Sequence, residues 1–163
     1  MRLQGRLVDL GNLLLVALVG SLMPSAGRHG SFIGMLSAKT ENRNPPVTEH
    51  DVRILLRADE LLKDESAWNR SDDRMCDDDE RHGKRSLFCA LQKACIEVAG
   101  EYQHRRAALQ EVRFVAQEVT RGRRFEHRLR DYNNLPETSL ADIKRVLNTA
   151  LGRVRERLKS TKP

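Results

Sequence analysis

The segment Ser-Leu-Phe-Cys-Ala-Leu-Gln-Lys-Ala-Cys-Ile-Glu-Val, residues 86–98, is the least polar run of the chain outside its N-terminal region. After Ser86, only Gln92, Lys93 and Glu97 interrupt it, and a helical wheel places these three on one side. The opposite side, at steps of three and four residues, carries Leu87, Leu91, Ala94 and Val98. A helix that is apolar around most of its circumference usually lies at the centre of a small helical domain. The segment therefore predicts a core helix.

The composition favours a helical domain with a charged surface. The chain has 163 residues, of which 4% are aromatic and 32% are charged. A β-sandwich would need more aromatic and β-branched residues in alternation, whereas this length suits one domain. The net charge of +6 permits anionic partners, but charge alone mainly concerns solubility and non-specific association.

Three more segments have apolar residues at helical spacing, at 48–65, 104–120 and 138–159. Together with a core helix over 86–99, they predict an all-α fold of about four helices in one domain, residues 48–159. A long polar loop, Ser66 to Lys84, would separate the first two helices. No internal repeat is visible.

Residues at the predicted helix ends support these boundaries. Thr48 with Asp51, and Ser139 with Asp142, have the spacing of a capping box in which a shorter acid replaces glutamate. Ser86 is suited to cap the core helix, and Gly100 to end it.

The N-terminal region has the pattern of a leader followed by a linker. Residues 1–27 combine early arginines with a short apolar run and small residues near a cleavage site, as in a secretory signal. Residues 28–47 are rich in Gly, Asn and Pro and predict a disordered linker. Alternatively, translation begins at Met35 and the upstream residues are not part of the protein. The first interpretation predicts export or membrane anchoring, and the second a cytoplasmic protein.

The three cysteines, Cys76, Cys89 and Cys95, cannot all pair within one chain and do not resemble a disulfide framework. Cys89 would lie one turn into the core helix, where the helix dipole favours a thiolate. It is therefore a candidate nucleophile, with His82, His104 or His127 as its base. The alternative is that the cysteines are small buried apolar residues, which is common for free cysteine.

A metal site is not expected, and no cofactor motif is present. Structural zinc needs paired ligands at short spacing, and the acidic run near Asp77 lacks the calcium-loop pattern because its sixth position is His82. This run predicts a solvated acidic loop.

The segment Arg121–Arg130 is crowded with arginine. Arg123 and Arg124 are candidates for phosphate contacts, and Phe125 for stacking on a base. No known nucleic-acid-binding signature accompanies them, and a solvated basic surface is the alternative.

Two further features stand out along the chain. Trp68 is the sole tryptophan and begins the long loop, where an indole commonly packs onto the helices and less often lines a ligand site. The segment Asp-Tyr-Asn-Asn at 131–134 predicts a turn before the last helix. Trp68, Tyr132 and Asn133 are candidate binding residues.

These landmarks occur in a recognisable order: Leu-Leu-Arg-Ala-Asp-Glu-Leu-Leu at 55–62, Trp68, Phe-Cys-Ala-Leu at 88–91, and Asp-Tyr-Asn-Asn at 131–134. Over about residues 50–155 the chain resembles a family of small bacterial helical proteins, a domain of unknown function. Tyr132 stands where members often have tryptophan, and Leu91-Gln92 where many have Gly-Ala. The resemblance implies the helical fold and no mechanism, and because the family lacks a leader it implies the Met35 start.

The function that the sequence favours is a non-catalytic binding or protein-interaction module, with self-association as one form of that interaction. No catalytic constellation exceeds what a plain helical protein would carry. An enzyme using Cys89 and a nucleic-acid binder using Arg121–Arg130 remain the alternatives.

Overall fold

The computed structural model of the protein describes residues 45–161. The predicted leader at 1–27, the alternative start at Met35 and residues 28–44 of the predicted linker lie outside this range.

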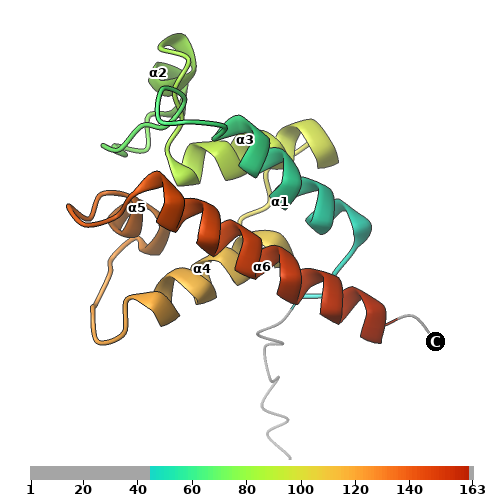
Figure 1. The fold of residues 1–163 in the computed structure, drawn as a ribbon. Coiled ribbons are helices and arrows are strands. Elements are labelled where there is room, and N and C mark those ends of the chain that lie inside the picture. Colours follow the sequence, from blue (N-terminus) through green and yellow to red (C-terminus); the bar gives the residue numbers. More distant parts are fainter. Residues whose placement is uncertain (1–44, 162–163) are drawn as a thin grey trace, which may run out of the picture. The chain divides into compact units, whose positions relative to one another are not determined.

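The described residues form six helices and no β-strand, which confirms the all-α prediction (Figure 1). The helices are α1 (Glu49–Leu61), α2 (Cys76–Arg81), α3 (Leu87–Ala99), α4 (Ala107–Val119), α5 (Arg128–Asn133) and α6 (Leu140–Ser160). Four correspond to the predicted helices. The short helices α2 and α5 fall where the sequence predicted a loop and a turn, since one or two helical turns are too short to show a period. No helix among residues 45–161 is long and apolar enough to cross a membrane.

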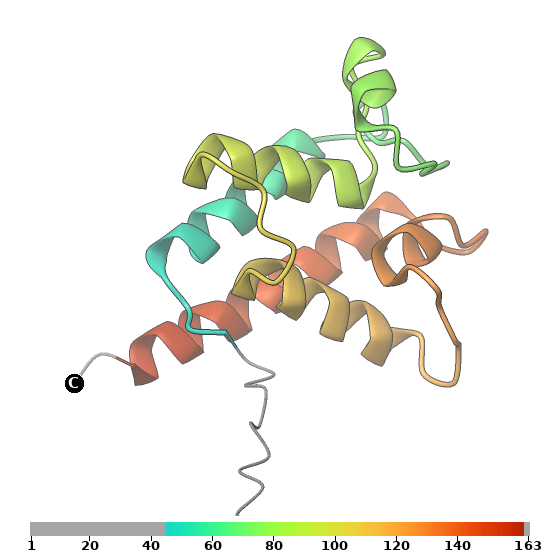
Figure 2. The ribbon, with the colours of Figure 1, turned by 180° about the vertical axis from the view of Figure 1, so that it is seen from behind.

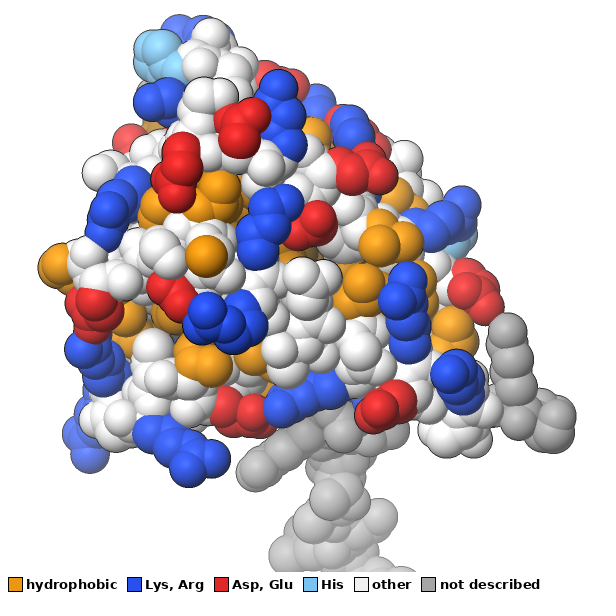
Figure 3. Space-filling model, in the orientation of Figure 1, with side chains coloured by type: hydrophobic (Ala, Val, Ile, Leu, Met, Phe, Trp, Pro, Cys, Tyr) orange, Lys and Arg blue, Asp and Glu red, His pale blue; other side chains and the backbone are white. Residues whose placement is uncertain are grey.

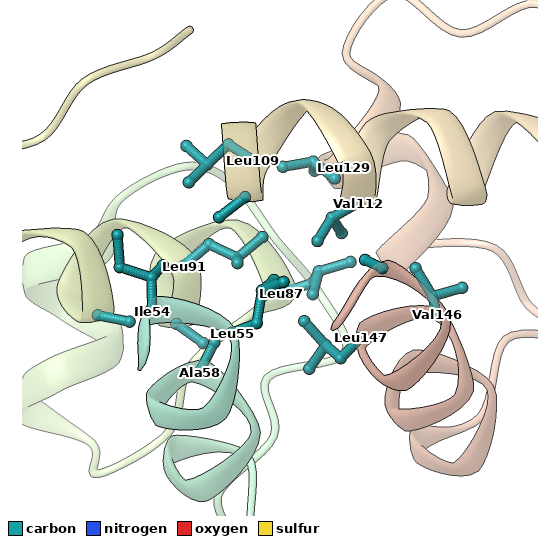
Figure 4. Packing of buried hydrophobic residues seen from close by; sticks show 14 of the residues in the cluster. Ile54, Leu55, Ala58, Leu87, Leu91, Leu109, Val112, Leu129, Val146 and Leu147 are labelled. Atoms are coloured by element: carbon teal, nitrogen blue, oxygen red, sulfur yellow. The ribbon is translucent and has the colours of Figure 1, made fainter. Parts of the chain in front are cut away.

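The four long helices enclose one hydrophobic core. Helix α1 packs against α3, α4 and α6, and α4 also packs against α5 and α6 (Figures 1 and 2). Leu87 and Leu91 of α3 lie among side chains from α1, α4 and α6, and both are fully buried (Figure 4). Helix α3 is therefore part of the core, as the sequence predicted, although Ile96 on its outer side is 46% exposed.

The predicted helix ends are present. The Ser86 hydroxyl accepts a hydrogen bond from the Cys89 amide, and Gly100 ends α3 with a φ of 81°, a left-handed conformation that glycine adopts at little cost. Asp51, which is buried, accepts hydrogen bonds from Thr48 and also from the Ala108 amide at 3.0 Å. One carboxylate thus caps the start of α1 and joins it to the start of α4.

Ion pairs join α6 to its neighbours. Arg153 forms a two-pronged pair with Glu118 of α4, and Arg157 binds the buried Glu111 of α4 at 2.5 Å. Arg157 also donates to the Pro45 carbonyl, and Val47 is buried in the core. Residues 45–47, the end of the predicted linker, therefore pack on the domain.

Asn133, at the end of α5, is the polar centre of the long loop. Its Oδ1 accepts from the Trp68 indole at 2.9 Å and from the Leu87 amide at 3.0 Å, and its Nδ2 donates to the Asn69 carbonyl at 3.0 Å. Next to it, Asn134 exchanges two hydrogen bonds with the backbone of Asp72. The two asparagines hold both the loop and the first turn of α3 against α5.

We expect Asn133→Ala to lower the free energy of unfolding by about 3 kcal/mol, because it leaves the buried Trp68 indole and Leu87 amide, and the half-buried Asn69 carbonyl, without their hydrogen bonds. Urea denaturation would measure this loss. Asn148→Ala, at an exposed position of α6, is the matched control and should change stability by less than about 0.5 kcal/mol. Equal effects of the two substitutions would contradict the role of Asn133.

Candidate functional site

A cavity of about 450 Å³ is lined by five separate parts of the chain, four of which contribute basic side chains. Its walls come from the loop before α2, the start of α3, the α3–α4 loop, α4, and the segment leading into and through α5. The basic residues that line it are Arg74, His104, Arg113, His127, Arg128 and Arg130. Glu126 is the acidic residue in the lining. We call this cavity the arginine pocket.

Arg113 is the most deeply placed of these charges, with only 9% of its surface exposed. Its Nη1 donates to the His104 carbonyl at 2.8 Å, and its Nη2 lies 3.2 Å from His104 Nδ1. Burial lowers the pKa of Arg113, and its polar partners are neutral groups. No carboxylate among residues 45–161 forms an ion pair with it. A guanidinium that is buried with no counter-ion is uncommon, since burying a charge is costly unless it is paired.

Arg113 affects both the pKa and the hydrogen bonding of His104. The positive charge of Arg113 holds the pKa of His104 below its ordinary value, with burial as the next cause. Because a guanidinium can only donate, His104 Nδ1 is the acceptor of the contact. The Tyr102 hydroxyl lies 3.2 Å from the same nitrogen. The neutral imidazole therefore aligns Arg113 and Tyr102 at the pocket wall.

Arg74 enters the pocket from an unusual backbone conformation. Its φ is 70°, a left-handed value that is uncommon outside glycine and that often occurs at functional sites. Its amide donates to Asp72 Oδ1 at 2.7 Å, and Asn134 holds Asp72 in turn. Arg74 Nη1 lies 3.2 Å from His127 Nε2.

Two more arginines reach the pocket from α5. Arg130 is paired with Asp131 at 2.8 Å, so its charge is compensated. Arg128 is exposed and forms no ion pair within the described part of the chain. Glu126 is 3.8 Å from His127. Arg74, Arg113 and Arg128 thus share one cavity without a carboxylate partner of their own.

A larger depression of about 810 Å³ beside α6 lacks this character. Of its basic residues, Lys144 pairs with Asp59 and Arg145 with Asp142. Its charges are already compensated, so the arginine pocket is the stronger candidate site.

The structure corrects the interpretation of the cysteines. Cys76 and Cys89 form a disulfide with a Cα–Cα distance of 5.2 Å, although the sequence did not resemble a disulfide framework. The sulfur of Cys89 is bonded to Cys76 and is not a free nucleophile in this structure. The two cysteines are thirteen positions apart in the sequence, and only the folding of α2 back onto the start of α3 brings them together.

The remaining cysteine, Cys95, is fully buried in α3. Burial raises the pKa of its thiol to about 11, so it stays protonated at neutral pH. It has the small apolar role expected of a free cysteine.

The three candidate histidines are divided between two cavities. His104 and His127 line the arginine pocket, whereas His82 lies with Asn69, Asp73, Asp79 and Arg81. Within residues 45–161, no group of three or more His, Cys, Asp or Glu side chains could hold a metal ion.

The other candidate binding residues have mostly internal roles. Trp68, Tyr132 and Asn133 are buried, and Trp68 and Tyr132 belong to the hydrophobic core cluster. Burial raises the pKa of Tyr132 to about 12. Arg123 pairs with Glu137, and Arg124 is exposed.

Sequence reasoning missed Arg74, Tyr102 and Arg113. The helical period of residues 104–120 predicts Arg113 largely on the outer face of its helix, beside the inward Val112. Its burial depends on the α3–α4 loop, which folds over it and offers the His104 carbonyl. No local signal in the sequence marks a contact of this kind.

The comparisons with known proteins identify one family and nothing closer. Residues 46–153 match the model of a family described as "Family of unknown function (DUF6197)". This confirms the resemblance drawn from the sequence over about residues 50–155. Neither the curated proteins nor the solved structures include a match.

The cysteine assignment predicts a definite thiol count. The native protein should not react with a thiol reagent, because Cys76 and Cys89 are bonded and Cys95 is buried. Unfolding without a reductant should expose one thiol, and unfolding after reduction should expose all three. A Cys95→Ala variant should expose no thiol when it is unfolded without a reductant. Three thiols without reduction would contradict the disulfide.

The charge on Arg113 predicts the titration of His104. Arg113→Gln should raise the pKa of His104 toward its ordinary value, which NMR of the ring protons would follow. Because the folded protein disfavours protonation of His104, wild-type stability should fall as pH drops through the ordinary histidine range toward the lower folded pKa. This loss should be smaller in Arg113→Gln. An unchanged pKa of His104 in the Arg113→Gln variant would show that Arg113 is not the main cause of the lowered pKa.

Proposed function

The chain belongs to this family of unknown function, and we propose that its helical domain is a non-catalytic binding module that holds a small anion in the arginine pocket. The observation that carries the proposal is the buried charge of Arg113, which has no carboxylate partner among the described residues.

A bound anion would give Arg113 the negatively charged partner that it lacks in the described part of the chain. Arg157 shows the contrast, since the chain gives it the buried Glu111 at 2.5 Å. Breaking such a buried pair leaves an uncompensated charge, which is strongly unfavourable. Groups held in perturbed environments of this kind cluster at functional sites. An anion that enters the pocket would gain charge-assisted hydrogen bonds and compensate Arg113.

The surrounding charges favour the same kind of ligand. Arg74 and Arg128 line the pocket without carboxylate partners, and His127 adds a titratable donor. Glu126 opposes them, but it is exposed and lies near His127. The net charge of the side chains that line the pocket is therefore positive.

The pocket is also held by rigid elements. Arg113 lies in the middle of α4, which Asp51 caps and Glu118 joins to α6. The Asn133 network and the disulfide hold the loop before α2 near the start of α3. A site formed in advance avoids the entropy cost of ordering on binding.

The alternatives have less support. A Cys89 nucleophile would require reduction of its disulfide. A nucleic-acid surface would need exposed basic residues in a continuous stripe. On the face shown in Figure 3, basic and acidic side chains are interspersed, and within the predicted basic segment Arg123 pairs with Glu137. Self-association or a protein partner stays a prediction.

The disulfide is relevant to the cellular compartment in which the protein resides. Disulfides persist mainly in oxidising compartments, so the Cys76–Cys89 bond supports export over a cytoplasmic location.

The test is calorimetric titration of the full chain with inorganic phosphate, at low ionic strength and without competing anions. We expect Arg113→Gln and, separately, Arg128→Gln to weaken binding by about tenfold or more, because each removes a charge-assisted contact. Arg128 is exposed, so its variant folds even if Arg113→Gln does not. Arg124→Gln, an exposed arginine outside the lining, is the matched control.

Binding that is unchanged in both pocket variants would overturn the proposal. Equal weakening in Arg124→Gln would show attraction by net charge alone, and would overturn it as well.

A further inference from the structure

We infer that the ligand of the arginine pocket is a phosphate monoester carried on a flat apolar group, such as an aromatic ring. This inference rests on the proposed function and names the class of anion. Two features of the pocket carry it: the number of uncompensated positive charges, and a row of rings in the same lining.

The positive charges of the pocket that lack carboxylate partners favour a ligand with two negative charges. Arg74, Arg113 and Arg128 have no carboxylate partner in the described part of the chain, while Arg130 is neutralised by Asp131. Glu126 offsets one charge, which leaves an excess of about two. A carboxylate brings one negative charge, whereas a phosphate monoester brings about 1.5 to 2 at neutral pH. A phosphate monoester also has three acceptor oxygens, which suits donors arriving from separate elements.

The donors come from separate parts of the chain. Arg113 belongs to α4 and Arg128 to α5, and Arg74 lies in the loop before α2. Two histidines add further nitrogen atoms to the lining. A flat carboxylate is satisfied by one guanidinium in a two-pronged pair, but a tetrahedral phosphate accepts from several directions.

The rings lie beside these charges. The Phe88 and Tyr102 ring centroids are 6.1 Å apart with an interplanar angle of 84°, and the Tyr102 and His104 centroids are 6.4 Å apart at 78°. All three residues line the pocket, and Phe88 and Tyr102 are half-buried. Edge-to-face contacts hold the three rings as one wall, on which a flat apolar group can stack. The volume of about 450 Å³ is within the usual range for a small-molecule site.

Three probes separate the two parts of the inference: phenyl phosphate, inorganic phosphate and benzoate. Each would be titrated calorimetrically into the full chain, with the ring protons of His104 followed by NMR to place the probe in the pocket. We expect phenyl phosphate to bind about tenfold more tightly than either of the others, a difference of about 1.4 kcal/mol.

Phe88→Leu tests the ring wall directly. It should weaken phenyl phosphate several-fold and leave inorganic phosphate unchanged. Phe114→Leu is the matched control, since Phe114 is a half-buried phenylalanine of α4 outside this lining. It should alter neither probe.

The outcomes are distinguishable. Phenyl phosphate no tighter than inorganic phosphate would overturn the apolar part, and benzoate equal to phenyl phosphate would overturn the phosphate part. Either result leaves anion binding intact. Failure of every probe to bind would overturn the proposed function together with this inference.

Discussion

The Asn133 side chain is the contact on which the rest of the structure depends. A single amide, fully buried, binds the Trp68 indole, the Leu87 amide and the Asn69 carbonyl. Without Asn133, the Trp68 indole and the Leu87 amide would be buried polar groups without a hydrogen bond, which is costly in a core. The loop after α1, the start of α3 and the end of α5 therefore form one unit, and the hydrophobic core closes beneath it.

This unit also determines where the arginine pocket lies. Asp72, bound by Asn134, holds Arg74 in its left-handed conformation, and Phe88 follows Leu87 at the start of α3. Arg128 begins the short helix that Asn133 ends. The disulfide from Cys76 to Cys89 crosses the same region. The contacts that pack the loop against the helices are consequently the ones that position residues of the pocket.

Two arginines show how the protein treats buried positive charge. Arg157 receives the buried Glu111 and the Pro45 carbonyl, and it secures α6 to α4 and to the residues before α1. Arg113, which is more deeply buried than Arg157, receives only neutral acceptors from His104. The first arrangement is complete within the chain. The second leaves a positive charge at a cavity without a carboxylate partner among the described residues.

By itself, the sequence determined the helical class, the four long helices and most of their ends. Periodicity and capping pairs such as Ser139 with Asp142 act within a few residues, so they can be read along the chain. It also singled out Trp68, Asn133 and His104, without their partners. Only the tertiary structure decided that Asn133 binds Trp68, that Cys89 pairs with Cys76, and that Arg113 is buried in a shared pocket. These contacts join segments distant in sequence, and their energies depend on burial and orientation that exist only once the helices have packed.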